Sequence, residues 1–280
     1  MSTLLGVQCF GLQKELSKDF NGTIKRIKNI GFQAIEPCIV FKKKQGKMPK
    51  NQWSLELLKE AKTVIDETDL SMYSAHIQLG LFPFWVPYEK ITHAILDIHN
   101  MTGIKYFVFS GMFSRAKQAK KWGKLLAKIQ VDIKPFGCQV LYHNHEDEFH
   151  EIEIEGEKVT ALDYFFQFAG SDVLLQLDIG WAGFADDEIR TAQQYASRIA
   201  GIHCKDFYAE AMNGSNTKFS IPKTSFAPIG CGVIKTKEIL EMRKEFSSFT
   251  DMVIIDQDHS GGDILEDLVI GYKNIRKWTD

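Results

Sequence analysis

The sequence lacks the features that mark several classes of protein. Its five cysteines are odd in number and include no Cys-x-x-Cys pair, which argues against a disulfide framework or a zinc ribbon. No stretch approaches the roughly 18 uninterrupted apolar residues of a membrane-spanning helix, and the N-terminus lacks a basic segment followed by a long apolar one. We therefore expect a cytoplasmic chain with free thiols and no membrane partner.

An excess of charge of one sign is also missing. Lysine and arginine together number 34 and the acidic residues 36, so the formal net charge is −2. Such a balance argues against a surface built for nucleic acid. The one dense cationic run, KKKQGK at residues 42–47, is typical of a solvated loop. With 44% hydrophobic residues and no break in composition, residues 1–280 are predicted to form one domain.

What the sequence does contain is a regular alternation of strand-like and helix-like segments. The strands are predicted at residues 4–10, 32–40, 70–77, 104–111, 137–145, 173–178, 199–206 and 252–256. Helical spacing of apolar residues follows each of them, at residues 15–29, 53–67, 88–101, 114–134, 161–168, 188–197, 235–246 and 264–278. Eight such units predict an α/β fold, a (β/α)8 TIM barrel.

Three details refine this prediction. Pro37 cannot donate to a strand ladder, which suggests that the second strand ends about there. The alternating segment EIEIEGEK, at residues 151–158, is typical of a small hairpin. A doubly wound sheet is the alternative fold, but no glycine-rich phosphate-binding sequence follows the first strand.

Metal-binding and proton-transferring side chains gather where the predicted strands end. Because side chains alternate along a strand, His143 and His145 project to the same side. In a barrel the carboxyl ends of the strands build the active site together. Two imidazoles and two carboxylates from different strands can hold a divalent cation and leave positions open for substrate. The strand-end set is Glu36, His76, His143, His145, Asp178, His203, Lys205 and Asp256.

Two loops stand out for their composition or length. The segment at residues 79–88, rich in aromatic residues, is too apolar for a mere connector and is either a lid over a pocket or a contact between subunits of a homo-oligomer. The loop of about thirty residues that leads to Gly232 is long for a compact domain, which favours a functional role.

Four strings at the ends of the later strands resemble one family. YHNHEDEF, LQLDIGWAG, GIHCKD and VIIDQDHSGGD are similar to the fifth-to-eighth-strand motifs of the xylose-isomerase-like barrels, in the group labelled sugar phosphate isomerases/epimerases. The resemblance extends to GFQAIEP and FAPIGCG and spans nearly the whole chain. Family members include ketose 3-epimerases, hydroxypyruvate isomerase, keto-inositol dehydratase and an apurinic-site endonuclease. By position it implies one divalent ion (Mn, Mg, Co or Zn) bound by His143, Asp178, His203 and Asp256.

The chain departs from the usual pattern of these relatives at two implied ligands. His143 stands where a glutamate is common, and Asp256 replaces a glutamate that also acts as the base in the epimerases. Asp256 is one methylene shorter than that glutamate, so we expect it to be chiefly a ligand. The identity of the base stays open among Asp256, His145 and Glu148.

The resemblance implies roles for the remaining strand-end residues. Lys205 would stabilise an enediolate oxygen, and Glu36 and His76 would orient substrate hydroxyls. Trp181 stands where many epimerases carry a histidine, and an aromatic ring there suits stacking on a sugar face.

The function expected from these residues is divalent-metal-dependent isomerisation or epimerisation of a small sugar or sugar-derived ketose. The reaction would begin with removal of a proton next to a metal-bound carbonyl. Elimination, as in a keto-inositol dehydratase or a 3-keto-glycoside lyase, begins in the same way and stays open. Two other classes are a non-catalytic sugar-binding barrel and an apurinic-site endonuclease, and Trp181 and the negative net charge count against the endonuclease.

Overall fold

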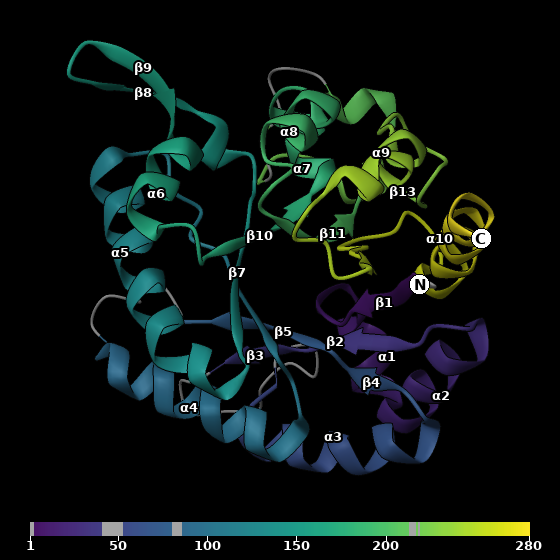
Figure 1. Cartoon of the computed structure of the whole chain (residues 1–280). Helices are drawn as coiled ribbons and strands as arrows, with labels where there is room; N and C mark the ends of the chain where they lie inside the picture. The colour runs from purple at the N-terminus through teal and green to yellow at the C-terminus, as the bar shows by residue number, and fades with distance from the viewer. Residues whose placement is uncertain (1–2, 41–52, 80–85, 213–216, 218) are drawn as a thin grey trace.

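The computed structural model describes residues 3–40, 53–79, 86–212, 217 and 219–280, and shows a curled, parallel ten-stranded sheet surrounded by helices (Figure 1). The strands of this sheet are β1 (Leu4–Gln8), β2 (Ala34–Glu36), β3 (Cys38–Val40), β4 (Ser71–Met72), β5 (Ser74–Gln78), β6 (Tyr106–Phe109), β7 (Gln139–His143), β10 (Leu174–Asp178), β11 (Ile199–Cys204) and β14 (Met252–Ile255). The helices are α1 (Gln13–Lys18), α2 (Phe20–Ile30), α3 (Leu55–Thr68), α4 (Tyr88–Thr102), α5 (Ala116–Ile133), α6 (Ala161–Ala169), α7 (Ile179–Ala185), α8 (Glu188–Gln194), α9 (Thr236–Met242) and α10 (Ile264–Thr279).

The parallel ladder closes on itself. β1 pairs with β14 on one side and with β2 on the other, while β3, which continues β2, pairs with β5. The prediction that the second strand ends near Pro37 is confirmed for β2, which ends at Glu36, but a further short strand, β3, follows at once. Although Pro37 has no N–H to donate, its carbonyl accepts from the backbone N of His76 at 2.9 Å, so the pairing continues into β3. The predicted (β/α)8 barrel is confirmed, with its second and third strands each divided into two short pieces.

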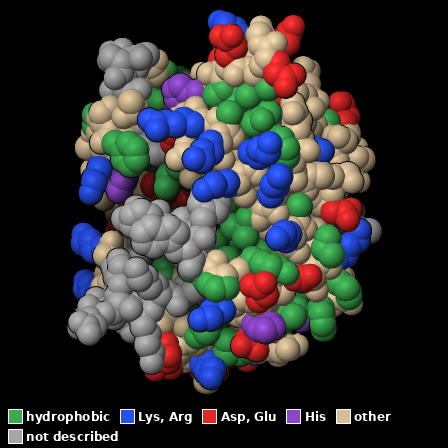
Figure 2. All heavy atoms as spheres, turned by 90° about the vertical axis from the view of Figure 1, so that its left-hand side faces the viewer, with side chains coloured by type: hydrophobic (Ala, Val, Ile, Leu, Met, Phe, Trp, Pro, Cys, Tyr) green, Lys and Arg blue, Asp and Glu red, His purple; other side chains and the backbone are tan. Residues whose placement is uncertain are grey.

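The helices cover the outside of the barrel, as α5 illustrates. Its buried side includes Trp122, Leu126 and Ile129, whereas its lysines point outward. Figure 2 shows lysine and arginine side chains gathered on the face over which this helix lies. Part of this cationic face packs on aromatic rings, because the Nζ of Lys120 lies 4.8 Å from the ring centre of Phe168. The outward lysines form the solvated side of an amphipathic helix.

Local sequence explains two departures from the predicted helices. The segment predicted as one helix over residues 15–29 is divided because the side chain of Asp19 accepts from the backbone N of Gly22 and begins α2 as its N-cap. Gly31 ends α2 with φ of 116°, a left-handed conformation that favours glycine. The short helix α7 was not predicted, because it follows the strand β10 without any intervening loop.

Two smaller sheets decorate the barrel. β8 (Glu151–Ile154) and β9 (Glu157–Thr160) form the predicted hairpin, which projects from the body at the upper left of Figure 1. β12 (Asp206–Phe207) and β13 (Phe226–Ala227) pair within the long loop after β11. There the carboxylate of Asp206 accepts from the backbone N of Gly230, Gly232 and Ile234 at 2.9–3.0 Å, which holds the described part of this loop against the barrel.

The interior of the barrel changes from apolar to polar toward the carboxyl ends of the strands. Along β14 the inward side chains are Met252 and Ile254, and Asp256 follows at the strand end. Along β7, Leu141 precedes His143 in the same way. An apolar cluster thus fills the amino-terminal end of the barrel, and the polar residues predicted from the sequence lie at the other end.

Two sequence expectations about residue types can be compared with this fold. Cys9, Cys38, Cys138 and Cys204 are free and buried, and Cys231 is free and exposed. Within the described ranges, no helix has the length and apolar character that crossing a membrane requires.

Candidate metal centre and active site

Four side chains from neighbouring strands converge at the carboxyl end of the barrel. His143 ends β7, Asp178 ends β10, His203 lies next to the end of β11, and Asp256 directly follows β14. One ligand atom from each lies within 4.8 Å of the others, and all four residues are buried. These are the four residues that the sequence predicted as metal ligands.

Both carboxylates of this cluster keep a buried oxygen without a hydrogen bond among the described residues. Asp178 Oδ1 accepts from the backbone N of Trp181 at 2.8 Å and caps α7, whereas Oδ2 has no such partner. Asp178 Oδ2 lies 3.7 Å from both His143 Nε2 and Lys205 Nζ. Asp256 Oδ1 is also buried and unpartnered. Because a buried carboxylate oxygen is costly without a donor or a cation, this set of oxygen and nitrogen ligands fits one divalent ion.

Burial governs the protonation of the first two ligands. Burial and the nearby imidazoles of His203, His76 and His145 hold the pKa of His143 well below its ordinary value. His143 is therefore neutral, which is the form that binds a metal ion. Burial also raises the pKa of Asp178 to about 7, because the nearby ammonium of Lys205 offsets only part of the cost of desolvation.

Charge pairing governs the other two ligands. Burial alone would lower the pKa of His203, but the carboxylates of Glu36 and Asp256 raise it to about 10. Burial would likewise raise the pKa of Asp256, but Lys205 and His203 hold it well below its ordinary value. In the absence of a metal ion, this half of the cluster is held together by ion pairs.

Lys205 supplies a fixed positive charge beside the cluster. Its Nζ lies 2.9 Å from Asp256 Oδ2 and 2.6 Å from Asp258 Oδ2, and its side chain is 1% exposed. Burial would lower the pKa of Lys205, but the surrounding carboxylates raise it, so the ammonium stays protonated. Gly180 allows this packing, because a Cβ added there would lie 2.6 Å from the Cβ of Lys205.

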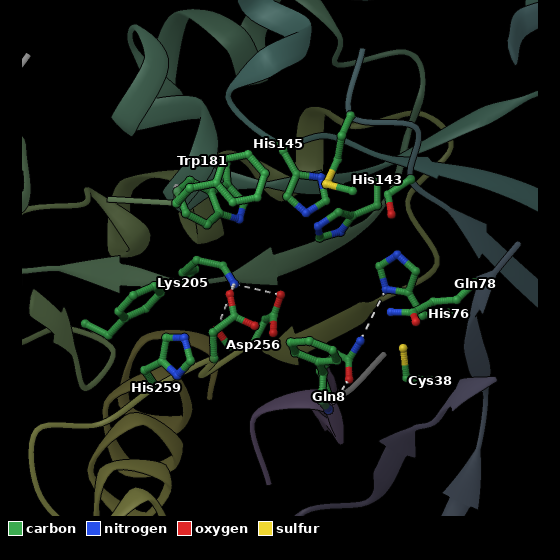
Figure 3. A pocket seen from close by; sticks show the side chains of 16 residues that line it. Gln8, Cys38, His76, Gln78, His143, His145, Trp181, Lys205, Asp256 and His259 are labelled. Carbon is green, nitrogen blue, oxygen red and sulfur yellow. Dashed lines mark hydrogen bonds and ion pairs between the residues drawn. The ribbon is translucent and has the colours of Figure 1, made fainter. Parts of the chain in front are cut away.

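The cluster opens into a cavity of about 260 Å³. In Figure 3 the labelled side chains point toward a common space, with Trp181 and Lys205 on one side and His76 on the other. The ring centres of His143 and His145 are 5.0 Å apart, and those of His145 and Trp181 are 6.1 Å apart. The predicted site residues in the cavity wall are His76, His143, His145, Trp181, Lys205 and Asp256.

A comparison with protein families agrees with this architecture. The model of the family described as xylose isomerase-like TIM barrel matches residues 24–268. The chain belongs to the xylose isomerase-like TIM barrel family. A comparison with curated proteins finds no significant match.

Three solved structures superpose along nearly the whole chain. A sugar phosphate isomerase/epimerase from Parabacteroides distasonis has a TM-score of 0.79 at 18% identity, covering 100% of this chain and 96% of that protein. A D-tagatose 3-epimerase-like protein has a TM-score of 0.67 at 15% identity, with coverage of 99% and 97%. A protein of the family from Mycobacterium smegmatis, solved in complex with magnesium, has a TM-score of 0.67 at 13% identity, with coverage of 99% and 96%. At these identities the likeness shows the shared fold.

Four predicted site residues of this xylose isomerase-like barrel do not line the cavity: the candidate ligands Asp178 and His203, and two further carboxylates, Glu148 and Glu36. Glu148 accepts from the Tyr142 hydroxyl at 2.5 Å and from the backbone N of His145 at 2.8 Å. Glu36 is fully buried and accepts from the Ser74 hydroxyl at 2.5 Å. The carboxylates of Glu148 and Glu36 face other protein groups, so we do not propose that either contacts the substrate directly.

The cavity-wall residues that the sequence analysis missed include Asp258, His259 and Gln8. Asp258 lies two residues after Asp256 and pairs with the same lysine. His259, which follows it, faces the ring of Phe226 with centroids 5.1 Å apart. Gln8 ends β1, and its Nε2 lies 3.2 Å from Nδ1 of His76. Gln8 also lies at the end of a strand, which is the position that identified the other site residues. It was not selected because its side chain is a neutral amide within an apolar run.

Two predictions about loops are not tested. Most of the segment predicted as a lid or subunit contact, residues 80–85, and the cationic run at residues 42–47 lie outside the described residues. Phe219, which belongs to the long loop after β11, contributes to the cavity wall. The loop predicted to be functional from its length therefore reaches the site.

Proposed function

We propose that this protein is a divalent-metal-dependent isomerase or epimerase of a small sugar or sugar-derived ketose. The observation that carries the proposal is the four-residue cluster His143, Asp178, His203 and Asp256, whose ligand atoms lie within 4.8 Å of one another. Two of its members, His143 and Asp256, line the cavity. The cavity, of about 260 Å³, is below the usual range of roughly 300–1,000 Å³ for drug-sized ligands, which favours a small substrate.

In the proposed enolisation, each of several residues around the cavity has a separate role. When bound, a divalent ion supplies a Lewis acid that polarises a carbonyl and acidifies the adjacent carbon. Lys205, fixed by its ion pairs, stabilises the negative charge that develops on the enediolate oxygen. Trp181 offers a ring face to the sugar, and His76 orients a hydroxyl from the opposite wall.

We assign proton abstraction to His145. Its ring lies in the cavity wall, and its backbone is held by the hydrogen bond from its N–H to Glu148 Oε2. Asp256 is a weaker candidate, because its Oδ2 lies 2.9 Å from Lys205 Nζ and 3.3 Å from His203 Nδ1. A base engaged by a lysine and an imidazole has less freedom to approach a substrate carbon, and proton transfer needs hydrogen-bond distance. In this assignment Glu148 positions His145.

Exchange of solvent deuterium into a ketose tests the proposal, because it reports proton abstraction without requiring net turnover. We would incubate the metal-loaded protein with a panel of ketoses and keto-inositols in deuterium oxide and follow deuterium incorporation by mass spectrometry. His145→Ala should slow exchange about 100-fold or more, the usual contribution of a general base. His150→Ala, which removes an exposed imidazole, is the matched control and should exchange at the wild-type rate.

The outcome separates the proposal from its rivals. Exchange with a new stereoisomer or aldose–ketose pair identifies the isomerase, whereas a product lighter by one water identifies an elimination and rejects the proposed reaction. If His145→Ala exchanges normally while Asp256→Asn loses exchange and keeps its metal ion, Asp256 is the base. A wild-type protein that binds no divalent ion would refute the metal-dependent mechanism.

A further inference from the structure

One buried carboxylate beneath the site has no role in the mechanism given above. Glu36 ends β2 and is fully buried inside the barrel. Its Oε2 accepts from Ser74 Oγ at 2.5 Å and from Gln176 Nε2 at 2.8 Å, so two other strands hold it in place. Its Oε1 lies 3.0 Å from His203 Nε2 and 3.7 Å from His76 Nδ1. The barrel therefore fixes one oxygen of this carboxylate and turns the other toward imidazoles.

Gln8 determines which of the two imidazoles can donate to Glu36. The Oε1 of Gln8 accepts from the backbone N of Phe10 at 2.6 Å, which orients the amide so that its Nε2 faces His76 Nδ1 at 3.2 Å. Since the amide nitrogen donates, Nδ1 of His76 is the acceptor and carries no proton to offer. Of these two imidazoles, His203 is therefore the one that can carry a proton on the nitrogen facing Glu36 Oε1, which is Nε2 at 3.0 Å.

The two nitrogens of His203 therefore face different environments. Nε2 points to Glu36, whereas Nδ1 lies 3.3 Å from Oδ2 of Asp256, inside the ligand cluster. An imidazole that donates from one nitrogen presents the lone pair of the other, and a carboxylate in this position raises the basicity of a ligating histidine. The paired charge also explains why a carboxylate is tolerated in the barrel interior.

We infer that Glu36 is a positioning residue for the metal centre: its charge, 3.0 Å from Nε2 of His203, favours the tautomer that carries its proton on Nε2 and leaves Nδ1 to bind the divalent ion. The inference rests on the proposed metal-dependent function but does not depend on which ketose is the substrate. It replaces the sequence expectation that Glu36 orients a substrate hydroxyl.

The variant Glu36→Gln tests this role because it removes the charge and keeps the shape. The barrel can accommodate the new amide, because Gln176 Oε1 is buried and has no hydrogen-bond partner among the described residues. The Gln176 side chain can turn so that this oxygen accepts from the new amide. Ser74→Ala is the matched control: it disturbs the same carboxylate at the same depth but leaves the Glu36 charge facing His203. A general loosening of the barrel would appear in both variants.

The affinity for Co²⁺ is the readout, measured by competition with a chelator and by the visible spectrum of the bound ion. We expect the dissociation constant to rise about 10- to 100-fold in Glu36→Gln and by less than about threefold in Ser74→Ala, which is the effect expected of a carboxylate that supports a ligating histidine.

Three results would overturn the inference. Equal affinity and an unchanged Co²⁺ spectrum in wild type and Glu36→Gln would show that His203 needs no carboxylate. Equal weakening in both variants would assign the effect to barrel packing. A wild-type protein that binds no ion would remove the metal centre itself, and with it the proposed function. If the wild type binds Co²⁺, Glu36→Gln binds it weakly and no ketose reacts, the inference stands and only the proposed reaction fails.

Discussion

Replacing Asp178 by asparagine should make the metal-free protein more stable while it abolishes metal binding. Burial raises the pKa of this carboxyl group from 3.8 to about 7. The folded protein therefore binds more protons than the unfolded chain between pH 3.8 and 7, and stability is lost as the pH rises through that window. Asparagine stays neutral, and its Oδ1 can still accept from the backbone N of Trp181 and cap α7.

The size of the effect follows from the pKa difference. A shift of about 3 units corresponds to about 4 kcal/mol at roughly 1.4 kcal/mol per unit. This full cost is present at pH 8, whereas less than about half of it has developed at pH 5. Because the charge of Asp178 is shared with Lys205 and Asp256, we take about 2 kcal/mol at pH 8 as the smallest gain that the reasoning predicts.

Urea unfolding at pH 5 and pH 8 in the presence of a chelator measures this gain. The matched control is Asp172→Asn, which neutralises an exposed carboxylate paired with Lys134 and should change stability by less than about 1 kcal/mol at either pH. Added divalent ion should stabilise the wild type by mass action and leave Asp178→Asn unchanged. The reasoning is refuted if Asp178→Asn is no more stable than the wild type at pH 8, or if its advantage is the same at both pH values.

Two further predictions concern the loop and the cavity wall. Asp206→Ala leaves the backbone N–H groups of Gly230, Gly232 and Ile234 without their acceptor, so we expect a loss of about 3 kcal/mol or more in urea unfolding; a loss below 1 kcal/mol would show that water replaces the carboxylate. Trp181→Ala should raise KM for the ketose severalfold while Trp181→Phe keeps most of the affinity, and equal KM values in both variants would remove the stacking role.

The convergence of the ligands was predictable because a parallel barrel leaves little choice. Once His143, Asp178, His203 and Asp256 are assigned to strand ends, the fold brings their side chains to one rim. The depth of Glu36 in the barrel, and therefore the groups that its carboxylate faces, was not predictable in the same way. Alternation along a strand identifies the inward side chains but not their depth, so Glu36 appeared to belong to the substrate layer.

Other details depend on contacts between residues distant in sequence. The extra helix α7 begins directly at Asp178 and places Trp181 in the cavity wall. Neither its capping bond nor the approach of Gly180 to Lys205 has a periodic signature in the sequence. Asp258 belongs to the same motif as Asp256, but its ion pair with Lys205 becomes visible only when β11 and β14 lie side by side.

Along the barrel interior, the side chains change from apolar to polar. The residues that stabilise the fold are therefore separate from those proposed to carry out the reaction. The residues that exclude water, such as Leu141 and Ile254, lie away from the rim at which the chemistry is proposed. Substitutions at the rim can therefore accumulate and redirect specificity without dissolving the scaffold beneath. Substrate specificity can therefore change during evolution by single substitutions. The core residues that the fold requires and the rim residues that can vary lie at opposite ends of the same strands.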